Sequence, residues 1–382
     1  MEQDYKNIAI IGAGAAGCLC AYHLLNNGHD VTLFDKGLPL RTLLPTGGGR
    51  CNLGHAEFDF KELAKNYPRG EKFLYSIFSK YSTGETLETF DEIGVEIYIQ
   101  ENGRIFPTSN SAKEVREKIL EKIIKANIIR EEALELVKLE NGFSIRTNKA
   151  KYLFTHIIIA TGGHSGYKLL NNFNINIIEP HPALVGLNTK EDFKELSGTV
   201  VRGANCNGYT DDLLFTHFGI SGPLTYTISS IKAFDTIPYE LSFDLCPELK
   251  DLQEVLNTNP HKEIKNIISK YMPQKIVNYI LKGIDETTKA HRIDGKTRDS
   301  ILDRIHGFKV TVTCTNKGEE TVTAGGVDLN EINPKTMEVK KVPNLYCIGE
   351  VLNIDGLCGG FNLQNAWSTA YVCATAVVLN QL

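Results

Sequence analysis

The stretch Asn7-Ile-Ala-Ile-Ile11-Gly12-Ala-Gly14-Ala-Ala-Gly17 decides the fold of this chain. It begins with an apolar run and ends in three glycines, and apolar residues then recur at helical spacing from Ala15 to Asn27. A second apolar run, Val31 to Phe34, follows and closes with Asp35. This order of strand, glycine turn, helix and strand predicts the first unit of a parallel sheet that binds a dinucleotide.

Each glycine of this turn has a separate expected task. Gly12 makes the tight turn, Gly14 lets the backbone approach a pyrophosphate, and Gly17 lets the helix pack close to the sheet. The N-terminus of the helix offers free N–H groups to the phosphates, and Asp35 lies where a carboxylate can bind ribose hydroxyls. The neighbouring positions assigned to the same site are Ala15, Ala16 and Lys36.

A second acidic and glycine-rich segment opens the last predicted helix. Gly349-Glu350 follows the apolar strand Leu345 to Ile348, and Gly359-Gly360 precedes a helix that starts near Phe361. Glu350 can accept hydrogen bonds from ribityl or ribose hydroxyls, and the helix N-terminus favours negative charge beside the glycine pair. The alternative is a plain glycine cap before a helix. Together with the first motif, this segment indicates FAD.

The strand Ile157 to Ala160 ends in Thr161-Gly162-Gly163, but no second complete GxGxxG unit for NAD(P)H is present. One sheet is therefore expected to hold one dinucleotide. From 184 to 243 the chain has short alternating segments broken by glycines, which predict strands. Helical periods follow from 247 to 305, and Phe308 to Cys314 alternates again. This order predicts a β domain that carries a helical insert, both inside the nucleotide-binding domain.

Composition sets further limits. The 382 residues are 42% hydrophobic and 23% charged, with a formal net charge of −5, so more than one domain and no overall basic field are expected. The nine cysteines form no CxxC pair, which argues against a thiol–disulfide site and against zinc, and no metal site is predicted. Their odd number without a signal peptide suggests the cytoplasm. No apolar run reaches membrane-spanning length, and no stable protein partner is indicated.

Four stretches resemble the HI0933-like flavoproteins, also called the BaiN/RdsA family. They are Thr46-Gly-Gly-Gly-Arg50-Cys51-Asn52, Gly103-Arg104-Ile-Phe106-Pro107, Leu214-Phe-Thr-His217-Phe-Gly-Ile-Ser-Gly222-Pro223, and Thr323-Ala-Gly325-Gly326-Val continuing into the last helix. The resemblance implies an α/β, glutathione-reductase-type, Rossmann-like FAD-binding domain at 1–183 and 322–382. It further implies an inserted β-barrel domain at 184–245 and 306–321, which itself carries a small helical insert domain at 246–305.

Two departures from the family pattern are visible. The family usually has Gly-Lys-Lys ahead of its Leu-Leu pair, whereas this chain has Leu40-Arg41-Thr42, which leaves Arg41 as the possible substitute. After Thr161-Gly-Gly-His-Ser165 the family continues through a longer loop, whereas Gly166-Tyr167 follows here almost at once. We expect this shortened loop to border the cofactor or substrate cleft and to affect substrate range.

The resemblance extends the set of cofactor residues. Gly47, Gly48 and Gly49 can present backbone N–H groups without a Cβ in the way, and Arg50 offers a cationic fork to phosphate or flavin oxygen. The alternative for Arg50 is a salt bridge that locks the loop. The remaining expected cofactor residues are Cys51, Asn52, Ala133, Thr161, Gly162, Gly163, Asp355, Phe361, Asn362 and Gln364, with Asp355 favoured as a residue that holds its loop.

Two residues are candidates for the catalytic acid or base. His217 lies in a glycine-flanked loop, and the competing interpretation is that it caps backbone groups within the β domain. Cys51 follows Arg50 beside the expected flavin, where its thiol could donate a proton, but a small buried cysteine is at least equally consistent with the sequence. Cys358 shares this ambiguity.

The expected function is an FAD-dependent oxidoreductase that uses NAD(P)H as a transient electron donor. The family implies acceptors of several kinds, and reduction of an activated C=C bond in a small molecule ranks level with reduction of uridine in ribosomal RNA. One alternative is an amine oxidase that produces hydrogen peroxide. An alternative from another class is a flavin-bearing binding or regulatory protein without turnover.

Overall fold

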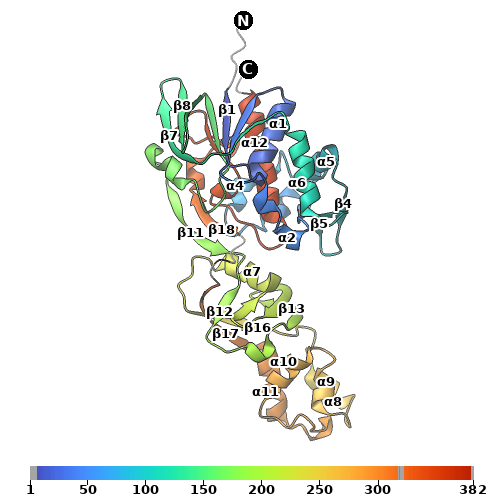
Figure 1. Ribbon diagram of the computed structural model, residues 1–382. Coiled ribbons are helices and arrows are strands. Elements are labelled where there is room, and N and C mark those ends of the chain that lie inside the picture. Colours follow the sequence, from blue (N-terminus) through green and yellow to red (C-terminus); the bar gives the residue numbers. More distant parts are fainter. Residues whose placement is uncertain (1–6, 317, 319–321, 380–382) are drawn as a thin grey trace. The chain divides into compact units, whose positions relative to one another are not determined.

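The computed structural model describes residues 7–316, 318 and 322–379 and divides into two compact units. The first unit comprises Met1–His181 and Val322–Leu382, and the second comprises Pro182–Thr321 (Figure 1). The helices from 246 to 305 fall in the same unit as the strands around them. A separate helical domain therefore stays a prediction.

A five-stranded parallel sheet forms the centre of the first unit, in the order β19-β10-β1-β2-β6. The strands are β1 (Ile8–Ile11), β2 (Val31–Phe34), β6 (Asn127–Ile129), β10 (His156–Ile159) and β19 (Leu345–Cys347). Every neighbouring pair runs parallel, and β1, β10 and β19 are buried along their whole length. Such near-continuous apolar strands are typical of a sheet covered on both faces. The predicted Rossmann-type fold is confirmed.

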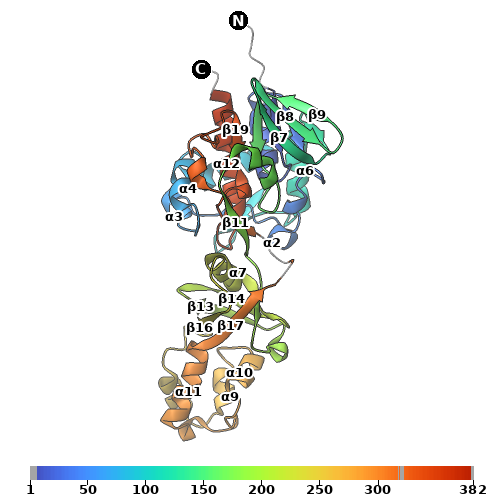
Figure 2. The same cartoon turned by 90° about the vertical axis from the view of Figure 1, so that its left-hand side faces the viewer.

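The first and last helices of the chain pack together against this sheet. Helix α1 (Ala15–Asn26) and α12 (Phe361–Leu379) make an extensive contact and lie side by side in the centre of the unit (Figures 1 and 2). Both are apolar around most of their circumference, as expected for buried helices. Residues from opposite ends of the sequence therefore share one core.

Smaller elements surround the parallel sheet. Strands β3 (Gly54–His55), β5 (Arg104–Pro107) and β4 (Ile97–Ile99) form one antiparallel sheet, and β7 (Ala133–Leu139), β8 (Gly142–Thr147) and β9 (Lys151–Phe154) form another. Strand β11 (Ile177–Ala183) pairs with β18 (Val322–Val327). The other helices are α2 (Thr46–Gly49), α3 (Phe60–Ala64), α4 (Glu71–Phe78), α5 (Thr83–Ile93) and α6 (Ala112–Lys122). A capping box between Ser82 and Glu85 starts α5, and left-handed Gly94 ends it.

The second unit contains a six-stranded antiparallel sheet in the order β13-β14-β15-β12-β17-β16. Its elements are β12 (Leu187–Thr189), β13 (Val200–Cys206), β14 (Tyr209–Phe215), β15 (Gly219–Ser221), β16 (Tyr239–Phe243), β17 (Phe308–Thr315), and helices α7 (Gly222–Ile231), α8 (Leu252–Asn257), α9 (Ile264–Ile268), α10 (Gln274–Ile280) and α11 (Gly295–His306). Two backbone hydrogen bonds of 2.8 Å between Asn205 and Asp244 join the edge strands β13 and β16. Closure into a β-barrel stays a prediction.

Within the part of the chain that the structure describes, no helix has both the length and the apolar character needed to cross a bilayer.

An imidazole is enclosed by tyrosines where α1 meets α12. His23 contacts the rings of Tyr22, Tyr81 and Tyr371 at centroid distances of 5.1, 6.0 and 5.1 Å. Its Nε2 is buried and has no hydrogen-bond partner among the described residues. Burial lowers the pKa of His23 from 6.5 to about 4. The folded state therefore favours the neutral ring.

We predict that His23 makes the first unit sensitive to acid. Between pH 6.5 and about 4 the unfolded chain binds a proton that the folded chain does not, so the free energy of unfolding falls as the pH falls, by about 3 kcal/mol from this group. Denaturant unfolding can be followed through the fluorescence of Trp367, the single tryptophan, which is buried in α12. The variant His23→Phe should lack this share of the pH dependence, and equal slopes for both proteins would contradict the prediction.

Candidate functional site

The first glycine turn has two closely packed positions and one open position. A Cβ at Gly12 would lie 2.3 Å from the carbonyl oxygen of Ala160, and one at Gly17 would lie 1.9 Å from the carbonyl oxygen of Gly12. At Gly14 the nearest atom would be Oγ1 of Thr42, at 3.9 Å. Gly14 also begins α1 without any side-chain cap. The first N–H groups of α1 are thus accessible to a ligand phosphate.

The carboxylate of Asp35 is held in place at the end of β2. One oxygen accepts a hydrogen bond from the N–H of Ala13 at 2.8 Å, and the other accepts one from the N–H of Gly37 at 2.7 Å. An ionised carboxylate has about four acceptor positions, so two remain for ribose hydroxyls. The fixed orientation suits the expected task of Asp35.

The neighbouring Lys36 forms an ion pair of 3.3 Å with Glu132, the residue before Ala133. Both members of the pair are more than half exposed, at 61% and 51%. The structure thereby brings Lys36 close to the start of β7, where Ala133 lies. Exposed pairs contribute little to stability, so this contact can open for a ligand at small cost.

The closing segment is joined directly to the first motif. A Cβ at Gly349 would lie only 2.8 Å from Cβ of Ala16 in α1. The N–H of Gly349 donates to Oγ1 of Thr369 in α12 at 2.9 Å. Gly349 has a φ of 71°, which a side chain rarely tolerates. These contacts hold the segment after β19 against the start of α1 and the middle of α12.

Glu350 faces the glycine turn after β10. Its Oε1 accepts a hydrogen bond from the N–H of Thr323 at 2.8 Å and lies 3.0 Å from where a Cβ at Gly163 would be. Burial raises the pKa of Glu350, and the N–H of Thr323 partly opposes this effect. His164 contacts the hydroxyl of the same threonine at 3.2 Å. The segments around Gly163 and Thr323 thus both meet the carboxylate of Glu350.

The short loop after β10 is closed on itself. The hydroxyl of Thr161 donates to the carbonyl oxygen of Ser165 at 2.7 Å, and the hydroxyl of Ser165 donates back to the carbonyl oxygen of Thr161 at 3.2 Å. A Cβ at Gly166 would lie 2.2 Å from Oγ1 of Thr161. A Cβ at Gly162, in contrast, would have only one atom within 4 Å, a carboxylate oxygen of Glu350 at 3.9 Å. The loop leaves its glycine backbone accessible beside the carboxylate.

The short element α2 is not a regular helix, because the glycines that precede Arg50 form a left-handed turn. Gly47, Gly48 and Gly49 have φ values of 58°, 69° and 85°, which only glycine adopts readily. Gly47 is enclosed, because a Cβ there would lie 2.8 Å from the backbone nitrogen of Asn52. No atom lies within 4 Å of a Cβ at Gly48. The turn therefore offers an open stretch of backbone to a ligand.

Arg50 is anchored without an ion pair. Its Nε donates to the carbonyl oxygen of Gly47 at 3.2 Å, and its guanidinium carbon lies 4.2 Å from the centroid of the Phe106 ring. None of the described carboxylates forms a salt bridge with it, so the salt-bridge alternative is not what the structure shows. The positive charge remains for an anionic ligand group.

Cys51 is fully buried, with 0% of its surface exposed. Burial raises the pKa of its thiol to about 12, so the thiol keeps its proton at neutral pH. A side chain that lined an open cofactor cleft would be accessible in a chain without ligand. The position of Cys51 favours the interpretation as a small buried cysteine. Cys358, beside Gly359, is only partly buried.

Asn52 connects the glycine turn to the start of α12. With its amide oriented to satisfy its neighbours, Asn52 donates to the carbonyl oxygens of Gly54 at 2.9 Å and Ile105 at 3.1 Å, and accepts from the N–H of Gly360 at 3.2 Å. A Cβ at Gly360 would lie 2.5 Å from the oxygen of Gly54. Two of the predicted cofactor segments are thus fixed relative to each other.

The loop before α12 is held by a buried ion pair. Asp355 is 0% exposed, and its two carboxylate oxygens accept from Nε and a terminal nitrogen of Arg69, which is 15% exposed. A paired and buried carboxylate has little capacity left for a ligand. The ion pair fixes Asp355 and Arg69 to each other and suits a residue that holds its loop.

Asn362 and Gln364 also use their side chains within the protein. The amide of Asn362 exchanges two hydrogen bonds of 2.9 Å with the backbone of Gly356. Gln364 is 0% exposed and donates to Oγ1 of Thr86 at 2.8 Å. Only their backbone, at the N-terminal end of α12, faces the glycine pair. The glycine turns and helix starts around the expected cofactor site are referred to below as the cradle. The side chains of Asn362 and Gln364 hold the cradle in shape and do not line it.

His55 is a site residue that our sequence interpretation missed. Its ring stacks on Phe361 at a centroid distance of 4.9 Å and an angle of 20°. A Cβ at Gly359 would lie 3.6 Å from it, and one at Gly103 would lie 2.5 Å from it. Burial lowers the pKa of His55. The only signal in the sequence was its position three residues after Asn52, which does not reveal the contact with α12.

His217 lies in the second unit, at the turn between β14 and β15. Its side chain is exposed, its ring makes no hydrogen bond to a described residue, and it contacts Phe218 edge-on at 5.3 Å. The backbone-capping interpretation is therefore not what the structure shows. His217 and Cys51 belong to different units. Among the described residues, no cluster of His, Cys, Asp or Glu could hold a metal ion.

Comparison with known proteins identifies relatives over nearly the whole chain. The family described as "HI0933-like protein Rossmann domain" matches residues 6–376. A ribosomal RNA dihydrouridine synthase of Haemophilus influenzae is 33% identical over 99% of both chains, and that of Escherichia coli is 30% identical over 97% of both. A 3-dehydro-bile acid delta(4,6)-reductase of Clostridium scindens is 28% identical over 97% of this chain and 98% of that one.

Solved structures share the fold at low sequence identity. A flavocytochrome c3 fumarate reductase gives a TM-score of 0.54 at 13% identity, covering 99% of this chain and 78% of that one. A 3-ketosteroid-delta4-(5alpha)-dehydrogenase of Rhodococcus jostii gives a TM-score of 0.51 at 11% identity, covering 99% and 98%. At such identities the likeness concerns the fold alone.

The glycines of the first turn allow a matched test of the cofactor cradle. Because a Cβ at Gly14 meets open space, Gly14→Ala should change the free energy of unfolding of the apoprotein by less than about 1 kcal/mol. It should weaken FAD binding by about tenfold or more, because the methyl group occupies space that the pyrophosphate needs. Gly17→Ala should instead destabilise the apoprotein by about 1–3 kcal/mol through overpacking.

Calorimetric titration of apoprotein with FAD and unfolding followed through Trp367 measure the two effects separately. If Gly14→Ala bound FAD as the wild type does, the pyrophosphate would not lie at this turn.

Proposed function

The chain belongs to the HI0933-like family and is an FAD-dependent oxidoreductase, and on this premise we propose that it reduces the C5=C6 bond of a uridine in ribosomal RNA. The observation that carries the proposal is the end-to-end similarity, at 30% and 33% identity, to two proteins named ribosomal RNA dihydrouridine synthases. Such a substrate would place the enzyme with the ribosomes, in the predicted cytoplasm.

The residues of the first unit fit FAD. Open backbone at Gly14 and Gly48, the uncompensated charge of Arg50 and the N-terminus of α1 suit a pyrophosphate. The spare acceptor positions of Asp35 suit ribose hydroxyls, and so does the carboxylate of Glu350 beside Gly162. Bound FAD would supply the two-electron chemistry, and the protein provides position, access and a proton.

The reaction adds one hydride and one proton across a carbon–carbon double bond. We propose that NAD(P)H is the source of the electrons. We propose His217 as the acid, because its exposed imidazole makes no hydrogen bond to a described residue and imidazole is the commonest general acid in enzymes. Cys51 stays the weaker candidate, since its thiol is protonated but enclosed. Glu350 is engaged with the backbone of Thr323 and serves orientation.

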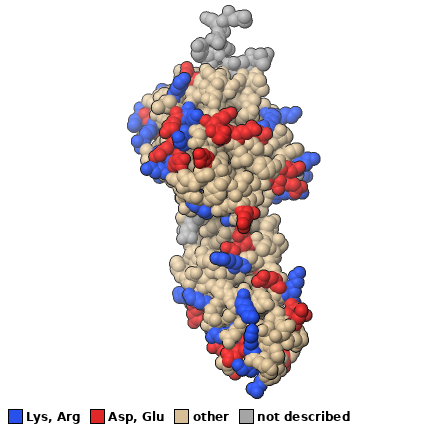
Figure 3. All heavy atoms as spheres, turned by 90° about the vertical axis from the view of Figure 1, so that its right-hand side faces the viewer, with Lys and Arg blue, Asp and Glu red and all other residues tan. Residues whose placement is uncertain are grey.

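A second candidate is reduction of a C=C bond in a small molecule. The relative named as a bile acid reductase, at 28% identity, favours it. The net charge of −5 gives no overall attraction for RNA. Figure 3 shows Lys and Arg intermixed with Asp and Glu on one face of the molecule. An RNA substrate would therefore have to bind through a local surface.

The proposed substrate can be tested in cells. Deleting the gene should remove dihydrouridine from ribosomal RNA at one or a few positions, and expressing the wild-type gene should restore it. The measurement is mass spectrometry of nucleosides from purified ribosomal RNA. An unchanged dihydrouridine content would eliminate the RNA substrate and leave the small-molecule reductase.

The absence of a second GxGxxG motif from the sequence leads to a kinetic prediction. If the nicotinamide binds transiently and leaves before the acceptor binds, double-reciprocal plots at several fixed acceptor concentrations should be parallel, as in ping-pong kinetics. Intersecting lines would indicate a ternary complex and a separate nicotinamide site. Steady-state rates with NADH and with NADPH should be compared in the same experiment.

A further inference from the structure

The segment 262–282 of the second unit differs in charge from the rest of the chain. It contains five lysines and one acidic residue, Glu263, whereas the whole chain has a formal charge of −5. Lys265 pairs with Glu286 at 2.7 Å. The other four have no ion-pair partner among the described carboxylates, and they are Lys262, Lys270, Lys275 and Lys282. The segment is therefore a local basic surface on an otherwise mixed molecule.

Helix α10 places part of this charge along one line. Lys275 and Tyr279 are four residues apart in α10, which puts them on one side of the helix. Lys282 lies in the turn after the helix, where its N–H donates to the carbonyl oxygen of Tyr279 at 3.3 Å. The Nζ of Lys275 donates to the carbonyl oxygen of Ser197 at 3.1 Å. Lys275 and Lys282 are exposed and Tyr279 is half-buried. This line of two cations and one aromatic ring is referred to below as the α10 track.

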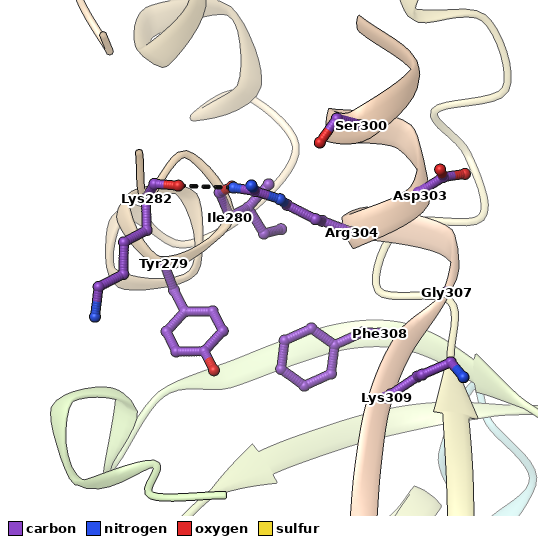
Figure 4. Close-up of a pocket in the computed structure, with 9 residues that line it drawn as sticks. All are labelled: Tyr279, Ile280, Lys282, Ser300, Asp303, Arg304, Gly307, Phe308 and Lys309. Carbon is purple, nitrogen blue, oxygen red and sulfur yellow. Dashed lines mark hydrogen bonds between the residues drawn. The ribbon is translucent and has the colours of Figure 1, made fainter. Parts of the chain in front are cut away.

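A hollow of about 550 Å³ adjoins one end of the α10 track. Its lining includes Tyr279, Lys282, Arg304 and Phe308 (Figure 4). Figure 4 shows Arg304 reaching across from α11 toward the end of α10. There its guanidinium donates to the carbonyl oxygens of Ile280 at 2.6 Å and Lys282 at 2.9 Å. Arg304 and Lys282 therefore both bring a cationic side chain to the lining of this hollow.

The ring of Tyr279 is held firmly. It packs at 5.9 Å from the ring of Phe308 and at 6.3 Å from that of Phe193. Acidic groups lie near too, because Asp303 lines the hollow and Lys309 pairs with Glu240 at 2.9 Å. The carboxylates of Glu191 and Glu195 also act electrostatically on Tyr279. A partly exposed aromatic ring that is held by other rings and has lysines near it is a suitable platform for an unpaired base.

A second hollow of about 350 Å³ lies at the other end of the α10 track. It is lined by Ser197, which Lys275 contacts, and by His217, the proposed acid. The α10 track therefore runs from the hollow beside Tyr279 to the hollow that contains His217, all within one unit.

From this arrangement we infer that the α10 track binds single-stranded RNA. Lys275, Lys282 and Arg304 bind successive phosphates, and one base stacks on Tyr279. A neighbouring nucleotide then reaches the hollow of His217. The inference deepens the proposed function and takes the choice of RNA from it. An acidic peptide would match the positive charges, but its side chains would not stack on the ring of Tyr279 as a base does.

The test measures binding of a fluorescein-labelled 12-nucleotide oligouridylate to full-length, FAD-loaded protein by fluorescence anisotropy at several salt concentrations. Lys275→Glu with Lys282→Glu should weaken binding by about tenfold or more and lower the salt slope by about 1.4. The matched control is Lys122→Glu with Lys125→Glu, two exposed lysines in and just after α6 that form no ion pair with a described carboxylate. The control makes the same change in net charge and should alter affinity by less than about twofold.

The aromatic contact has its own pair of variants. Tyr279→Ala should weaken binding by about fivefold or more, whereas Tyr279→Phe keeps the ring and should bind as the wild type does. Thermal melting shows whether the double lysine variant folds. If it does not fold, the two Tyr279 variants test RNA binding at the α10 track on their own. Equal losses in the α10 and α6 lysine variants, no binding by the wild type, or equally effective competition by oligoglutamate would each overturn the inference.

The outcome is separable from that of the proposed function. If the α10 variants bind RNA more weakly but gene deletion leaves dihydrouridine unchanged, the binding surface is supported and the proposed substrate is wrong. If deletion removes dihydrouridine but these variants bind RNA normally, only the assignment of the surface to α10 fails.

Discussion

Backbone contact between strand ends and helix starts, too close for any side chain, is the constraint on which the first unit depends. The turn after β1 meets the end of β10 at Gly12, α1 packs onto that turn at Gly17, and the segment after β19 meets α1 at Gly349. A Cβ at any of the three would lie 2.8 Å or less from another atom. Because these contacts join both ends of the chain, they bring the two predicted cofactor segments to one edge of the sheet.

Two groups of residues lie at this edge of the sheet. The first group holds the cradle in shape, and the second group remains accessible to a ligand. Asn52, Asp355, Asn362 and Gln364 use their side chains to fix loops and helix starts. The open groups are glycine backbone, helix N-termini and the guanidinium of Arg50. Such preorganisation lets an anionic cofactor bind without first ordering its site.

Local sequence patterns were sufficient to predict the features of the molecule that depend on residues close together in the chain. The βαβ unit, the separate tasks of its glycines and the family resemblance could all be predicted, and the structure and the comparisons confirm the fold and the family. Contacts such as Arg69 with Asp355, 286 residues apart, could not be predicted, because no periodicity links them. The burial of Cys51 and the stacking of His55 on Phe361 depend on tertiary packing in the same way.

We propose that one cradle, built from both ends of the chain, holds FAD that a nicotinamide can reduce. The decisive measurement is the absorbance spectrum of the purified protein, followed anaerobically as NADPH or NADH is added. We expect a flavin spectrum that bleaches on addition, and release of about one FAD per chain on denaturation. A colourless protein that cannot be reconstituted with FAD would contradict it.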